Sequence, residues 1–143
     1  MMRRTAGKLH WMIPVVAVGL LIIIGLLFGP RETPMSVAND FMDALARGDS
    51  KRLTQLSYIG HGTAEELEKK WDFTVKVPGK YYRFTWQVRG ETIESDNVAT
   101  VKVDIDKGSG FADPMSIPLI KQDGKWKVDA YGLSRAIYPG LPH

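Results

Sequence analysis

The chain opens with a long apolar run before any regular polar pattern begins. This run is WMIPVVAVGLLIIIGLLF, residues 11–28, and it contains no charged or amide side chain. As an α-helix, a run of this length spans about 27 Å, which nearly matches the hydrocarbon core of a bilayer. Three basic residues precede it and no acidic residue does: Arg3, Arg4 and Lys8. The pattern predicts a transmembrane anchor over residues 11–29, after a basic cytoplasmic tip over residues 1–10.

Because basic flanks stay in the cytoplasm, the chain after Pro30 is expected outside it, as part of a single-pass protein of the cell (inner) membrane. Two other interpretations of the apolar run remain open. A cleaved signal peptide has the same basic start, but the exit LLFGPRETP lacks the small residues of a cleavage site. The third interpretation is a buried helix of a folded domain.

The next segment has apolar residues at three- and four-residue spacing, which predicts a helix. Thr33 is placed as its N-cap, Pro34 at its first helical position and Gly48 at its C-terminal cap. Its apolar stripe is Met35, Ala38, Phe41, Met42 and Leu45. One face of this helix is therefore expected to pack, and the other to meet water.

Two shorter helices are expected after the first. Asp49 caps one that ends at Leu56, and the loop YIGHG follows it. Thr63 and Glu66, three residues apart, form a capping box for a third helix that ends near Trp71.

From Lys80 onward, apolar residues alternate with polar ones at every second position, which predicts strands with one face in the core. The first strand turns these residues inward: Tyr82, Phe84, Trp86 and Val88. It turns these outward: Tyr81, Arg83, Thr85 and Gln87. The inward residues of the next two strands are Ala99, Val101, Val103 and Ile105, then Met115, Ile117 and Leu119. Pro118 cannot donate to a ladder, so it implies an edge or a bulge.

After the turn QDG, a last strand turns Trp126, Val128 and Ala130 inward. Together these elements predict an α+β domain over residues 34–135, in which two or three helices pack on a curved antiparallel sheet of about four strands. Residues 30–33 are a linker and residues 136–143 a C-terminal tail. A chain of 143 residues has room for one such domain besides the anchor.

The net charge of +3 belongs to the N-terminal tip. Three of the 19 Lys and Arg residues precede the apolar run, which leaves 16 basic against 16 acidic residues in the rest of the chain. A neutral domain lacks the gathered basic surface that phosphate binding needs, so nucleic acid is not an expected partner. The chain has no cysteine, which removes disulfides, thiol nucleophiles and cysteine metal ligands.

The order of ANDFMDALARGDSKRLTQLS, a strand meander and DGKWKVDA resembles the nuclear transport factor 2-like superfamily over about residues 33–131. The resemblance implies a cone-shaped, cystatin-like α+β fold, which ketosteroid isomerase and scytalone dehydratase also use. It is greatest to small, membrane-anchored bacterial branches of uncharacterised function. It also implies a homodimer through the sheet face. The fold serves many functions and does not assign one.

Enzymatic members of that superfamily move a proton with an acid, His or Tyr inside the cone. Among the inward positions only Tyr82 carries an oxygen, so no catalytic residue is assigned and catalysis is not expected. Solvated faces are expected for four acids: Asp40, Asp43, Asp104 and Asp106. His61 lies in a glycine loop without a second ligand at a metal spacing, so neither a metal nor a cofactor is expected.

Two groups of residues are candidate binding sites. The ligand-pocket candidates are Tyr82, Phe84, Trp86 and Trp126, which form plain core in the alternative interpretation. The partner-surface candidates on the outer face are Tyr81, Arg83 and Gln87.

The favoured function is a membrane-tethered, non-catalytic binding or assembly domain that contacts another envelope protein or itself. The alternatives are a carrier of a small apolar ligand and an isomerase or dehydratase that uses the cone pocket. A filled cone favours the first function, an open apolar cavity the second, and an open cavity with an acid or histidine the third.

Overall fold

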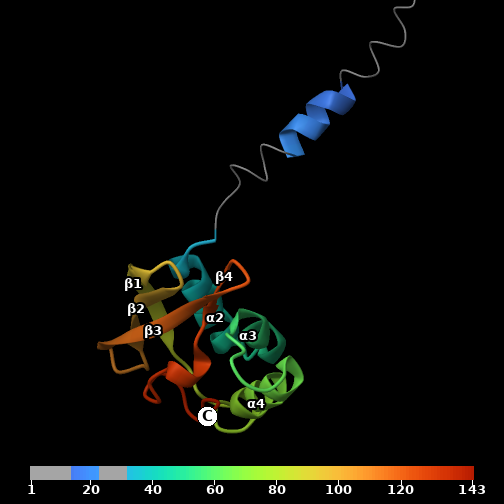
Figure 1. The fold of residues 1–143 in the computed structure, drawn as a ribbon. Coiled ribbons are helices and arrows are strands. Elements are labelled where there is room, and N and C mark those ends of the chain that lie inside the picture. The colour runs from blue at the N-terminus through green and yellow to red at the C-terminus, as the bar shows by residue number, and fades with distance from the viewer. Residues whose placement is uncertain (1–13, 23–31) are drawn as a thin grey trace, which may run out of the picture. The chain divides into compact units, whose positions relative to one another are not determined.

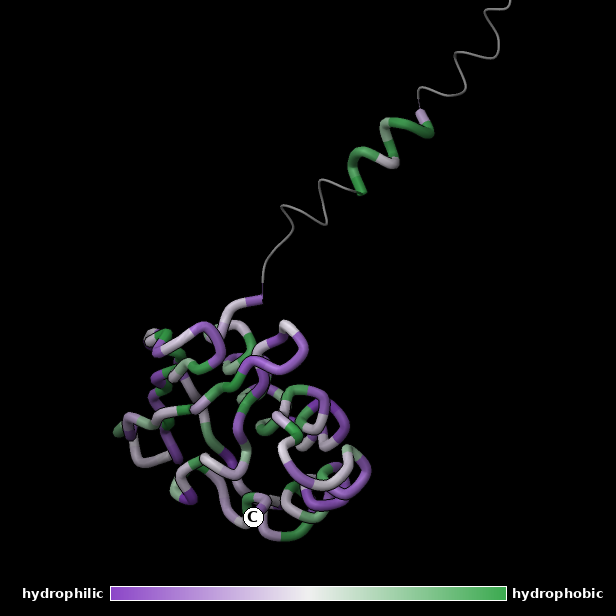
Figure 2. Tube along the Cα trace, viewed as in Figure 1, coloured by the Kyte–Doolittle hydropathy of each residue, from purple (hydrophilic) through white to green (hydrophobic). Residues whose placement is uncertain are grey.

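The computed structural model describes residues 14–22 and 32–143, which belong to two compact units divided between Arg31 and Glu32. Residues 14–22 are helical, and Figure 2 shows their apolar character in green. The tip and the other residues of the predicted anchor lie outside the described residues. Within the described ranges, no helix has the length and hydropathy that crossing a membrane requires.

The first helix of the domain, α2, spans Pro34–Arg47 and has the predicted caps. Thr33 Oγ1 accepts a hydrogen bond from Ser36 N at 3.1 Å, and the Ser36 hydroxyl accepts one from Thr33 N at 3.0 Å. Gly48 ends the helix with φ 69°, a left-handed conformation that glycine adopts without strain. These contacts satisfy backbone groups that the helix itself leaves unpaired.

The two other α-helices of residues 32–143 also begin at their predicted caps. Helix α3 spans Ser50–Leu56, and the Asp49 side chain accepts from Arg52 N at 3.0 Å. Helix α4 spans Ala64–Lys76 and has the predicted capping box. It continues beyond the predicted end near Trp71, because buried Thr74 and Val75 extend its packed face.

The sheet has four antiparallel strands in chain order, β1-β2-β3-β4. They are β1 (Thr85–Ser95), β2 (Val98–Asp106), β3 (Ala112–Gln122) and β4 (Lys125–Val128), and a short 3₁₀ helix, η1 (Ala130–Gly132), follows them. Figure 1 shows the helices gathered on one side of the sheet. This architecture confirms the predicted α+β class and the number of strands.

The inward faces of the strands are as predicted, except that Ala130, although buried, belongs to η1 and not to the last strand, which ends at Val128. Full burial is found for Ala99, Val101, Val103, Ile105, Ile117 and Leu119. Tyr82 and Phe84 are partly buried and alternate with exposed neighbours, but they precede the first paired residue, Thr85. The polar–apolar alternation therefore extends beyond the strand itself.

Pro118 lies in an interior strand, which corrects the expectation of an edge or a bulge. It lies opposite Thr100 of β2 in regular register. Its carbonyl oxygen accepts from Asp129 N at 2.9 Å, so its nitrogen faces the same side, toward β4. The ladder to β4 ends at the pair Leu119–Val128. The proline nitrogen thus points past the end of a short strand, where it removes no ladder bond.

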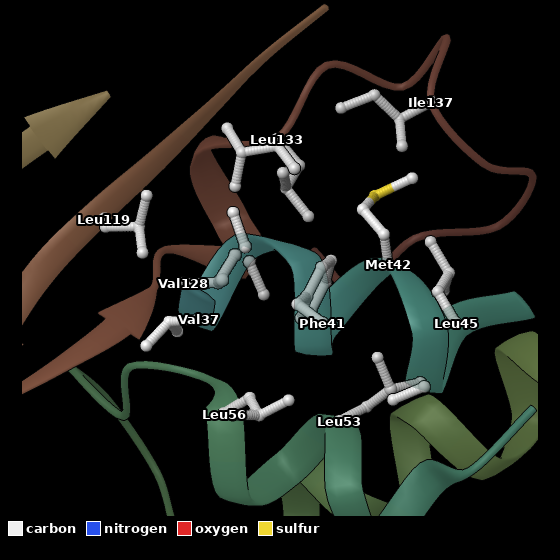
Figure 3. Close-up of a cluster of buried hydrophobic side chains, with 14 of the residues drawn as sticks. Val37, Phe41, Met42, Leu45, Leu53, Leu56, Leu119, Val128, Leu133 and Ile137 are labelled. Atoms are coloured by element: carbon white, nitrogen blue, oxygen red, sulfur yellow. The ribbon is translucent and has the colours of Figure 1, made fainter. Parts of the chain in front are cut away.

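The core forms between the helices and the inner face of the sheet. Figure 3 shows Phe41 and Met42 of α2 among side chains from α3, from the sheet and from the segment after β4. Residues 136–143, set apart above as a tail, contribute Ile137, Tyr138 and Leu141 to this core, with exposed fractions of 0%, 3% and 7%. They pack because burial removes their apolar surface, and that of the core side chains they contact, from water.

Trp126→Ala tests the inward face of β4. The indole is 8% exposed, and its loss should lower the free energy of unfolding of residues 32–143 by about 3 kcal/mol or more. These residues form a compact unit with its own core, so urea unfolding of this fragment can measure the effect. The matched variant Lys125→Ala, at an exposed neighbouring position, should change it by less than about 0.5 kcal/mol. Equal urea midpoints for the two variants would show that the face assignment is wrong.

Candidate functional site

The interior between the helices and the sheet is filled by large apolar side chains. Phe41 and Trp71 meet there edge to face, with ring centroids 5.6 Å apart. Both side chains, like that of Met42, have no exposed surface. The indole nitrogen of Trp71 donates to Ser57 Oγ at 3.2 Å, and that hydroxyl donates to Leu53 O at 2.6 Å. The interior is therefore built of packed apolar side chains with their few polar atoms paired.

The segment after η1, residues 133–142, packs against this interior. It has no strand or helix, yet Leu133, Ile137 and Tyr138 are buried. Side chains from other elements bind its backbone. Thr74 Oγ1 donates to Gly140 O at 2.6 Å, and Tyr82 Oη donates to Ile137 O at 3.4 Å. We call residues 133–142 the C-terminal plug.

Tyr138 is the centre of the plug. Its ring meets Tyr82 edge to face at 5.1 Å and Phe84 at 6.2 Å between centroids. Its hydroxyl donates to Gly79 O at 3.3 Å. A Cβ on Gly79 would overlap the phenol oxygen, so only glycine leaves room for this ring. Burial raises the pKa of the Tyr138 phenol above its ordinary value of 10.0, and the charge of Arg83 partly opposes this by lowering that pKa.

Three of the four ligand-pocket candidates form a row of aromatic rings in which Phe84 contacts both Tyr82 and Trp86. Tyr82 and Phe84 contact each other, at 5.9 Å between centroids, and Tyr138 of the plug. Trp86 contacts Phe84 at 5.9 Å between ring centroids and donates its indole N–H to Asn39 Oδ1 of α2 at 3.1 Å. Trp126 lies apart, where Lys121 stacks over its ring at 5.4 Å.

Trp126 lines a cleft of about 650 Å³ between the helices and the β3–β4 hairpin. Val37 and Leu56 add apolar surface beside it. The basic side chains of the cleft are Lys51, Arg52, Lys125 and Lys127, and acidic side chains are present in equal number. Arg52 and Asp40 approach to 3.5 Å. This cleft can hold a small molecule with an apolar part and a polar part, and its balanced charges favour neither sign.

The partner-surface candidates lie at exposed positions, as predicted. Tyr81 is 81% exposed, and Lys80 stacks over its ring at 5.2 Å. Arg83 and Gln87 are also exposed. Arg83 donates to the backbone oxygens of Lys80 and Tyr82. These residues present polar and aromatic surface to solvent, which is suitable for a contact with another protein.

The other titratable residues considered in the sequence have local roles. Asp43 pairs with Arg47 one turn later in α2 at 2.5 Å, and Asp104 pairs with Arg89 at 2.6 Å. His61 is exposed beside a shallow hollow that Lys70 and Tyr131 also line. Among residues 14–22 and 32–143, no group of three or more acidic or histidine side chains has the geometry of a metal site.

Glu91 is a carboxylate that the sequence analysis did not place on the inner face. The pairing of β1 with β2 shifts register between Val88 and Gly90, so Glu91 lies opposite inward Val101. Its Oε2 accepts a hydrogen bond from Met35 N at 3.1 Å. The negative charge thus stabilises the N-terminus of α2 at the rim of the cone. Gly90 inside a strand pattern is the signal that could have revealed the bulge.

Comparison with solved structures places this arrangement in a known class, the NTF2-like or cystatin-like α+β fold. One similar structure is an NTF2-like protein from Campylobacter jejuni, named as a proposed transpeptidase, with 17% identity and a TM-score of 0.50 over 68% of this chain and 97% of that one. Another is a domain of unknown function with a cystatin-like fold from Nostoc punctiforme, with 15% identity and a TM-score of 0.50 over 66% and 69% of the two chains. At these identities the likeness concerns the fold alone.

Residues 28–129 match the family model described as a domain of unknown function, DUF4878, and the chain belongs to this family. The comparison with curated proteins finds no match. The match to the family ends before the C-terminal plug, so the residues that close the cone lie beyond the matched part of the chain.

Tyr138→Phe tests how firmly the plug is held. Loss of the hydrogen bond to Gly79 O should lower the free energy of unfolding by about 1 kcal/mol, measured by urea unfolding of residues 32–143. Tyr131→Phe, at a position 43% exposed, is the matched control and should change it by less than about 0.5 kcal/mol.

The pH dependence of stability gives a second readout of Tyr138. Folding raises the pKa of this phenol, so above pH 10.0 the unfolded chain loses the phenol proton before the folded protein does. The contribution of Tyr138 to the free energy of unfolding is therefore complete below pH 10.0 and is lost as the pH rises further. The free energy of unfolding should therefore fall less steeply above pH 10.0 in Tyr138→Phe than in the unchanged protein. Identical slopes would mean that Tyr138 is not buried in solution.

Proposed function

We propose that this protein is a membrane-tethered, extracytoplasmic domain that acts by binding another envelope protein or a second copy of itself. Residues 11–29 serve as the tether in this proposal, because they form an apolar run of bilayer length behind a basic tip. The folded domain then lies outside the cytoplasm, and its surface performs the function.

One observation carries the proposal. The aromatic side chains that would line a ligand pocket in the cone, Tyr82 and Phe84, already contact Tyr138 of the C-terminal plug. The plug is bound by Thr74 and Tyr82 and buries apolar side chains of its own. A substrate or carried ligand would have to displace it. Binding through the outside of the domain needs no such change.

The outer surface offers suitable residues for a contact. Tyr81 and Arg83 are side-chain types that protein interfaces favour, and both are exposed beside Gln87. Their position before and within β1 places them at an edge strand of the sheet. A second copy of the chain or an envelope protein could pack on this edge.

A carrier of a small ligand is the second candidate, and the cleft beside Trp126 favours it. The cleft has a volume of about 650 Å³, apolar surface and a mixed set of charges. These features suit a small amphipathic molecule. Catalysis would also require a group that moves a proton at a bound substrate, and the inner face of the cone offers Glu91 only at its rim, occupied by the α2 N-terminus.

The tether is tested by the N-terminus of the mature protein. We expect protein purified from membranes to retain residues 1–10, because the exit of the apolar run lacks a cleavage pattern. Mass spectrometry of the intact protein measures this. A mature N-terminus between Gly29 and Met35 would establish a cleaved signal peptide instead.

The binding role is tested by complementation of a deletion strain with full-length variants. Arg83→Glu should impair function, because it places a repelling charge in the proposed contact. His61→Ala and Asp43→Asn should leave function intact, since neither residue belongs to that surface. Each variant is first checked for equal abundance. Full rescue by Arg83→Glu together with failure of His61→Ala would favour a catalytic role.

A further inference from the structure

The outer face of α4 carries large apolar side chains that the domain leaves exposed. Phe73 lies in the second half of this helix and is 60% exposed, and Val77, its C-cap residue one turn later, is 59% exposed. They border a shallow hollow of about 630 Å³ whose lining residues all belong to α4 or its C-cap. The opposite face of the helix holds Leu67 and Trp71 in the core. Exposed large apolar side chains grouped in this way are typical of an interaction surface.

The charges along this face alternate in sign. Four charged residues of the hollow follow one line along the helix, at spacings of four, three and four residues: Glu65, Lys69, Asp72 and Lys76. Lys76 Nζ pairs with Asp72 at 2.8 Å. Glu65 and Lys69 are exposed and make no ion pair within residues 32–143. The row therefore offers charges of both signs to a second molecule.

An alternating row of this kind is complementary to itself in the antiparallel direction. It begins with an acid and ends with a base, so it has the opposite sign at every position when it is followed from the other end. In an antiparallel pair of α4 helices about a two-fold axis, Glu65 of each copy lies level with Lys76 of the other. In the same way, Lys69 lies level with Asp72. A parallel pair would instead place like charges opposite each other.

The apolar side chains meet in the same arrangement. Phe73 and Val77 lie together on one flank of the charged row. The two-fold axis brings the apolar flanks of both copies to the same side of the contact, so each covers the other. Glu68, the remaining residue of the hollow, lies on the opposite flank, where it also lines the cleft beside Trp126. A partner with charges of only one sign would match half of the row, whereas a second copy matches all of it.

We propose that the outer face of α4 binds the same face of a second copy of this chain, in antiparallel orientation. This inference rests on the proposed function, because it names one surface through which the tethered domain binds a second copy of itself. The surface is distinct from Tyr81, Arg83 and Gln87. A contact between two helix faces buries less area than a permanent dimer does, but copies held in one membrane meet at a raised local concentration.

Energy transfer between labelled copies measures this association. The chain has no cysteine, so a single cysteine in place of Asp96, in the exposed turn between β1 and β2, carries either a donor or an acceptor dye. The full chain is reconstituted in phosphatidylcholine vesicles, and transfer is followed as the protein-to-lipid ratio is raised. We expect saturable transfer that excess unlabelled protein abolishes. The association should weaken as salt is raised, because exposed ion pairs contribute to it.

Two charge reversals test the antiparallel register. Glu65→Lys places a lysine opposite Lys76 of the second copy, and Lys76→Glu places a glutamate opposite Glu65. Each variant alone should associate about tenfold more weakly or less, because like charges then face each other. A mixture of the two variants, one with the donor and one with the acceptor, should restore transfer, because each changed charge then faces its opposite. A change within a single folded domain would not produce recovery in the mixture.

The apolar part of the contact is tested by Phe73→Asp, which should weaken the association about tenfold or more. Phe111→Asp is the matched control. Phe111 is an exposed aromatic residue between β2 and β3, outside the α4 face, and its replacement should leave the transfer unchanged. All the changed positions are exposed, and thermal unfolding checks that each variant is folded.

Several results would overturn this proposal. Unchanged transfer in Glu65→Lys or Phe73→Asp, or no recovery in the mixture of charge reversals, would exclude the antiparallel α4 contact. Transfer that Arg83→Glu abolishes and Glu65→Lys leaves intact would assign self-association to the surface of Tyr81, Arg83 and Gln87. If the unchanged protein shows no transfer while Arg83→Glu impairs complementation, the proposed function stands and only the α4 contact is lost.

Discussion

The packing of α2 against the inner face of the sheet is the contact on which the rest of the domain depends. Phe41 and Met42 of this helix are fully buried, and Trp71 of α4 closes on Phe41 from the other side. The sheet turns a continuous apolar face toward them, from Ala99 and Val101 to Leu119. Without this cover the strands would expose that apolar face to water. The exposure would be unfavourable, because a small domain buries little other apolar surface.

The buried polar atoms agree with an interior that serves structure. Within the described residues, every buried side-chain nitrogen or oxygen has a hydrogen-bond partner. Ser57 is the example at the centre, because its hydroxyl accepts from Trp71 and donates to Leu53 O.

The C-terminal plug links the fold to the proposed function. Gly79 leaves room for Tyr138 of the plug, and the rings of Tyr82 and Phe84 pack against it. Thr74 holds the plug by a hydrogen bond to its backbone. Leu141 and Pro142 of the plug also line a surface cleft of about 380 Å³ together with Phe73 of α4. Because the plug occupies the interior, the binding that we propose involves the outer surface of the domain.

The sequence alone determined the local features of this protein. Helix caps at Thr33, Asp49 and Thr63 were readable because capping depends on residues three positions apart. The inward faces of β2 and β3 were readable because strand side chains alternate with a period of two. Local geometry fixes both signals, so no knowledge of distant contacts was needed.

Only the tertiary structure decided where distant segments meet. It placed Glu91 at the N-terminus of α2 through a shift in strand register, put Trp126 in a cleft apart from Tyr82 and Phe84, and returned Tyr138 to the cone. Each of these contacts joins residues far apart in the chain. These long-range contacts depend on which apolar surface remains exposed after the sheet and the helices have packed. The spacing of apolar residues and the capping residues in the sequence carry no information about that surface.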